Sequence, residues 1–93
     1  MDFRIAYHAA SRHTPPEGAL ELLWEALGPV REDVSFALGN REITANWRGD
    51  VSISMTQEER VQIGRRAVLD VVLRVCDAAP ELDSEWFAVS PRL

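Results

Sequence analysis

The sequence has no lysine, only one cysteine and no long apolar run. Cys76, being alone, cannot form a disulfide within the chain, and the first residues lack the pattern of a secretion signal. No apolar stretch comes near the ~20 residues that a membrane-spanning helix needs. We therefore expect a cytoplasmic protein that makes no membrane contact.

The shortage of positive charge argues against a nucleic-acid-binding protein. The sequence contains ten arginines and fifteen acidic residues, and the formal net charge is -5. The arginines are spread along the chain, so no dense basic patch of the kind that contacts phosphates is expected. Exclusive use of arginine would suit recognition of carboxylates or phosphates, but the codon usage of a GC-rich genome is the simpler explanation.

The length and composition fit one small folded domain covering residues 1–93. With 46% hydrophobic and 27% charged residues among 93, the chain is too apolar for disorder and too short for two domains. A core of this size is marginal, and association with a second copy would add to it.

The first third of the chain predicts a strand followed by a helix. Apolar and more polar residues alternate over residues 2–9, which is typical of a half-buried strand. Thr14 as N-cap, Pro15 at the first helical position and Glu17 in a capping box predict that a helix begins there. The helix is expected to end at residues 28–29, a Gly-Pro pair.

Three alternating segments then predict an antiparallel meander. They span residues 34–38, 43–47 and 51–55, and short glycine-containing turns separate them. A second capping box, Thr56 with Glu59, predicts a long helix that reaches about Ala79. Residues 85–90 alternate again and predict a final strand.

This order of elements, β-α-β-β-β-α-β, predicts an α+β fold with a largely antiparallel sheet and two helices packed on one face. The second helix is apolar around more of its circumference than one sheet face covers, which predicts a homodimer. The residues concerned are Val68, Leu69, Val71, Val72, Leu73, Val75 and Cys76.

The loop between the first strand and the first helix is the candidate ligand-binding site. A helix N-terminus attracts anions, and the side chains expected there are Tyr7, His8, Ser11, Arg12 and His13. Pro15 and Pro16 remove backbone donors and Glu17 adds a carboxylate, so a simple capped helix start explains the same residues.

Nothing in the sequence predicts a catalytic centre, a metal site or a cofactor. Two histidines and one cysteine do not have the spacing of a zinc site. Cys76 lies on the apolar face of the second predicted helix and is expected to be a small buried hydrophobic residue. No nucleophile elbow or phosphate-binding glycine loop is present in the sequence.

Two groups of acidic residues could form an interaction surface for a basic protein partner. They are Glu17, Glu21 and Glu25 in the first group and Asp77, Glu81, Asp83 and Glu85 in the second. A solvated surface that favours solubility is the simpler explanation, since rows of charge usually serve that purpose.

Taken together, these patterns favour a small acidic intracellular protein-binding or regulatory module, expected to be a homodimer. One alternative is a small enzyme or ligand-binding protein with a pocket near residues 10–16. Another is an acidic inhibitor of a nucleic-acid-handling complex, in which carboxylates imitate phosphate charge.

Overall fold

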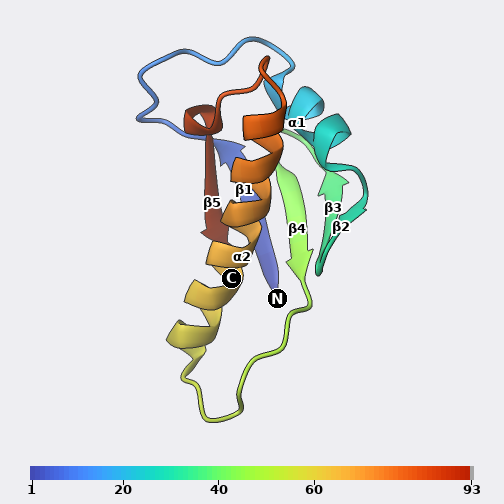
Figure 1. Ribbon diagram of the computed structural model, residues 1–93. Coiled ribbons are helices and arrows are strands. Elements are labelled where there is room, and N and C mark those ends of the chain that lie inside the picture. The colour runs from blue at the N-terminus through green and yellow to red at the C-terminus, as the bar shows by residue number, and fades with distance from the viewer. Residues whose placement is uncertain (93) are drawn as a thin grey trace.

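The computed structural model describes residues 1–92 and contains one antiparallel sheet with two α-helices (Figure 1). The elements follow the predicted order β-α-β-β-β-α-β, and the α+β class is confirmed. In chain order they are β1 (Asp2–Tyr7), α1 (Ala19–Leu27), β2 (Val30–Arg31), β3 (Val34–Leu38), β4 (Ile43–Trp47), α2 (Gln57–Ala78), the 3-10 helix η1 (Ser84–Trp86) and β5 (Phe87–Pro91).

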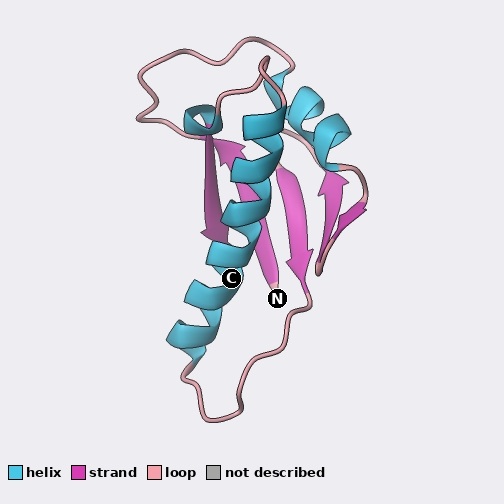
Figure 2. Cartoon of the chain, in the orientation of Figure 1, coloured by secondary structure: helices cyan, strands magenta, loops and turns pink. Residues whose placement is uncertain are grey.

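The strands lie side by side in the order β2-β3-β4-β1-β5, and each neighbouring pair is antiparallel. Phe3 pairs with Ala45, and Ile5 pairs with both Ile43 and Val89. All five of these side chains are buried, whereas the residues between them are not. One face of the sheet is therefore the core face. The long helix α2 crosses in front of it, and α1 packs on the same face over β3 (Figure 2).

Most of the apolar surface of α2 that predicted a dimer is covered by other parts of the same chain. Five of the seven residues noted above are buried beneath α1 and the sheet: Val68, Val71, Val72, Val75 and Cys76. Leu69 is half-buried, and Leu73 is 42% exposed. Most of this apolar surface thus has a partner within one chain, and homodimerisation stays a prediction.

The start of α2 confirms the predicted capping box. The backbone N–H of Glu59 donates to Oγ1 of Thr56, and the backbone N–H of Thr56 donates to Oε1 of Glu59, each over 3.1 Å. These bonds satisfy two donors that the first turn of a helix otherwise leaves free. The bond from Thr56 also holds the pKa of the Glu59 carboxyl below its usual range.

The predicted strand at residues 51–55 is wrong. Residues 48–56 form an irregular connection, drawn at the bottom of Figure 1, in which Ile53 is 94% exposed. The reason is that β4 has no free edge, because β3 pairs along one side of it and β1 along the other. The third strand between the helices is instead β2, two residues long, which pairs with β3.

The predicted start of the first helix is also wrong. Helix α1 begins at Ala19, after Gly18 in a left-handed conformation (φ 82°), and no side chain caps it at that position. Pro16 disfavours the α conformation at Pro15, so a helix cannot readily begin where the capping pattern placed it. The hydroxyl of Tyr7 instead accepts a hydrogen bond from the N–H of Leu20 at 3.1 Å.

Three strand boundaries differ by one or two residues from the sequence prediction. Strand β1 ends at Tyr7 rather than at residue 9. Residues 85 and 86 belong to η1, which turns the chain into β5, and β5 extends to Pro91.

Candidate binding groove between α1 and α2

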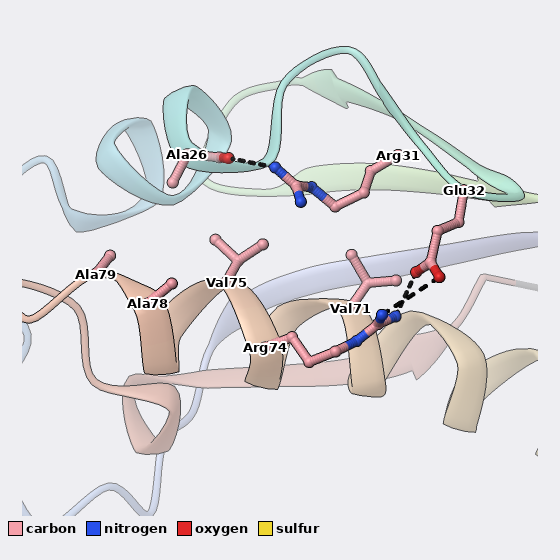
Figure 3. A pocket seen from close by; sticks show the side chains of 8 residues that line it. All are labelled: Ala26, Arg31, Glu32, Val71, Arg74, Val75, Ala78 and Ala79. Atoms are coloured by element: carbon pink, nitrogen blue, oxygen red, sulfur yellow. Dashed lines mark hydrogen bonds and ion pairs between the residues drawn. The ribbon is translucent and has the colours of Figure 1, made fainter.

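A groove runs between the end of α1, the β2–β3 turn and the second half of α2 (Figure 3). Its volume is about 490 Å³, and it opens to solvent. The lining residues are Ala26, Arg31, Glu32, Val71, Arg74, Val75, Ala78 and Ala79. Val71 and Val75 are buried, while the three alanines are too small to fill the space between the helices. The groove therefore has an apolar floor and a charged rim.

Arg31 stands at the rim because of its place in β2. It pairs with the core-facing Val34, so its side chain lies on the helix side of the sheet. Its Nε donates to the carbonyl of Leu27 and its Nη2 to the carbonyl of Ala26, both over 3.3 Å. These carbonyls lie at the negative end of the α1 dipole, where a guanidinium is stabilised.

Arg74 and Glu32 form a two-pronged ion pair across one end of the groove (Figure 3). Nη1 of Arg74 lies 3.3 Å from Oε1 of Glu32, and Nη2 bonds the other carboxylate oxygen. The Nε of Arg74 donates over 3.3 Å to the carbonyl of Asp70, which lies one helical turn earlier in α2. This bond holds the guanidinium against the helix. The pair connects the β2–β3 turn to α2.

The charges at the rim keep one another ionised. The hydrogen bond from Arg74, with the charges of Arg74 and Arg31, holds the pKa of the Glu32 carboxyl below its usual range. The same pair raises the pKa of the Arg74 guanidinium. At neutral pH, Glu32 is therefore a carboxylate that accepts hydrogen bonds and not a proton donor. The groove has the chemistry of a binding site for an apolar group with a carboxylate beside it.

A second, smaller cavity of about 280 Å³ brings together three of the five predicted ligand-binding residues. His8, Ser11 and Arg12 line it, together with Ala10, Glu85 and Phe87. Nδ1 of His8 accepts from the N–H of Ala10, and the Ser11 hydroxyl donates to the carbonyl of His13. These local bonds organise the loop itself, and the carboxylate of Glu85 opposes an anion in the cavity.

The other two predicted residues lie elsewhere. His13 is exposed and does not line the cavity. Tyr7 stacks on Phe87 with ring centroids 6.1 Å apart, and its hydroxyl contacts the start of α1. Five residues separate His13 from Ala19, so α1 does not begin directly after this loop as the sequence predicts.

The acidic residues are distributed over several segments. Glu17 precedes α1, while Glu21 and Glu25 are exposed on it. The second group extends from the end of α2 to η1, where Oδ1 of Asp83 accepts from the N–H of Glu85 over 2.9 Å. Asp77 and Glu81 are exposed. An encounter with a basic partner stays a prediction.

Cys76 is the buried hydrophobe that the sequence predicts. Burial, and to a lesser extent the charge of Asp83, raises the pKa of its thiol to about 11. A thiol in this environment is protonated at neutral pH and is a poor nucleophile. Within residues 1–92, no three His, Cys, Asp or Glu side chains form a group that could hold a metal ion.

No protein-family model, curated protein or solved structure matches this chain. Over residues 1–92, neither helix combines the length and the apolar character that crossing a membrane requires.

The groove residues were not found by sequence reasoning. Arg31 lies four residues after Leu27, a spacing compatible with capping of a helix C-terminus, and this local signal could have identified it. Glu32 and Arg74 are 42 positions apart, and no local pattern connects them.

Proposed function

We propose that this chain is a protein-binding module whose groove between α1 and α2 receives a short segment of a partner protein. The observation that carries the proposal is the apolar floor of Val71 and Val75 beside the guanidinium groups of Arg31 and Arg74. Apolar side chains of a partner would be removed from water on this floor, and arginine at the rim would supply directional hydrogen bonds.

The shape of the groove favours a segment of chain over a small molecule. The α2 residues that line it extend from Val71 to Ala78, which corresponds to about 10 Å at ~1.5 Å per residue. An extended peptide covers that length with about three residues. Small ligands are usually enclosed over most of their surface, whereas this groove is only partly enclosed.

Selection from a library of random displayed peptides tests the proposal. The wild-type protein serves for selection, and the Ala78→Trp variant, which fills the groove, serves for counter-selection. Gln62→Trp is the matched control, because it adds the same side chain to an exposed position of α2 outside the groove. Circular dichroism confirms that both variants remain folded.

We expect selected peptides to bind the wild type and the Gln62→Trp variant alike and to lose at least tenfold in affinity for Ala78→Trp. A loss of about 1.4 kcal/mol corresponds to that factor. Peptides that bind Ala78→Trp as well as they bind the wild type would contradict the groove as the binding surface.

Homodimerisation is proposed as an additional property of the module. The half-buried Leu69 and the exposed Leu73, which lie on α2 and do not line the groove, support it. Light scattering at tens of micromolar should give a mass of twice 10.5 kDa. A mass of one chain at that concentration would remove this part of the proposal.

A further inference from the structure

The carboxylate of Glu32 lies at a place in the groove where two guanidinium groups favour a negative charge. Both terminal nitrogens of Arg74 bond it, and the charge of Arg31 also stabilises its ionised form. A guanidinium presents two parallel N–H groups that match the two oxygens of a carboxylate. This is a built carboxylate site, filled by a residue of the chain itself.

We infer that Glu32 occupies the position that a partner's carboxylate takes on binding, so that an Asp or Glu of the partner replaces Glu32 on Arg74. The inference rests on the proposed function, since it identifies the chemistry of the segment that the groove receives. The segment would carry one acidic residue, with apolar side chains beside it that lie on Val71 and Val75.

The exposed position of Glu32 allows its carboxylate to leave Arg74 when a partner's carboxylate binds there. It lies in the exposed two-residue turn between β2 and β3, and 53% of its side chain is accessible to solvent. Within residues 1–92, its carboxylate has no hydrogen-bond partner other than Arg74. Exposed ion pairs contribute little to stability, so release of Glu32 into water costs little.

Arg74, in contrast, would stay in place during the exchange. Its Nε is bonded to the carbonyl of Asp70, on the same face of α2 one turn earlier. This bond orients the guanidinium whether or not Glu32 is present. In addition, the charge of Arg31, which helps to lower the pKa of Glu32, would also act on a partner's carboxylate at the same position.

The test compares Glu32→Gln with Asp33→Asn. Both variants remove one negative charge from the same turn, but only Glu32 bonds Arg74. Each variant is titrated with a peptide from the selection above that carries an acidic residue, and with a twin in which that residue is the corresponding amide. Isothermal titration calorimetry gives the dissociation constants.

We expect Glu32→Gln to bind the acidic peptide about two- to fivefold more tightly than Asp33→Asn does, because a competing exposed ion pair has been removed. The amide twin should show no such gain. Arg74→Gln should bind the acidic peptide and its twin equally well.

Three outcomes separate this inference from the proposed function. Equal affinities of Glu32→Gln and Asp33→Asn for the acidic peptide would overturn the inference alone. Selected peptides that need the groove but carry no acidic residue would do the same and leave the protein-binding function intact. Failure to select any peptide that Ala78→Trp weakens would overturn both.

Discussion

Gly64 lies where α2 passes closest to the sheet. A Cβ atom at this position would be 2.7 Å from Cζ of Phe3 and 2.8 Å from Cε3 of Trp47, both parts of rigid buried rings. The glycine thus lets the helix lie directly on β1 and β4. In an exposed helix the same glycine would be a weak point, since alanine is favoured there by about 1 kcal/mol.

Replacing Gly64 by alanine should therefore destabilise the protein, although it improves helix propensity. Overpacking a core costs ~1–3 kcal/mol against a propensity gain of about 1 kcal/mol, and because both neighbouring rings are buried and rigid we expect a net loss of up to about 2 kcal/mol in urea unfolding. Gln62→Ala, exposed on the same helix, is the control and should be nearly neutral. A Gly64→Ala variant as stable as the wild type would show that α2 can move away from the two rings at no cost.

At the scale of elements, α2 depends on its capping box to define where it begins. Thr56→Ala removes the oxygen that accepts from the N–H of Glu59 and should lower the free energy of unfolding by ~0.5–2 kcal/mol. Thr56→Ser keeps that oxygen and should retain most of the stability. Chemical denaturation measures both variants, and equal stability of Thr56→Ala and the wild type would mean that the cap does not hold the helix start.

Elements with local signals were predictable from the sequence. The cap of α2 is formed by residues three positions apart, and the alternation in β1, β3 and β4 reports directly on the buried face. The segment at 51–55 alternates in the same way, yet it forms no strand because β1 already pairs with β4. Pairing between distant segments decides such a case, and alternation carries no information about it.

The opposite error concerns β2. Two residues are too few to show alternation, so Val30–Arg31 gave no strand signal, and its pairing with β3 follows from the hairpin geometry. The missed strand is also the element that brings Arg31 to the groove. The missed strand is therefore connected with the omission of Arg31, whereas Glu32 and Arg74 were missed because 42 positions separate them.

For the whole molecule, the loop site and the groove differ in how much the sequence could reveal. His8, Ser11 and Arg12 are neighbours in sequence, and the structure does place them around one cavity. The groove forms only where α1, the β2–β3 turn and α2 meet. Its alanines and valines fit a helix pattern in any core, and its arginines are two among ten. Apart from the spacing of Arg31 from Leu27, only the packing of the elements distinguishes them.

The central claim is that a partner segment lies on the floor of the groove, and methyl NMR tests it most directly. When the protein is titrated with a selected acidic peptide, the methyl signals of Val71 and Val75 should shift and saturate, since both side chains line the groove. The methyls of Val89, buried on β5, should not move. Saturable shifts confined to the cavity of His8 and Arg12, or to Leu69 and Leu73, with Val71 and Val75 unchanged, would contradict the account.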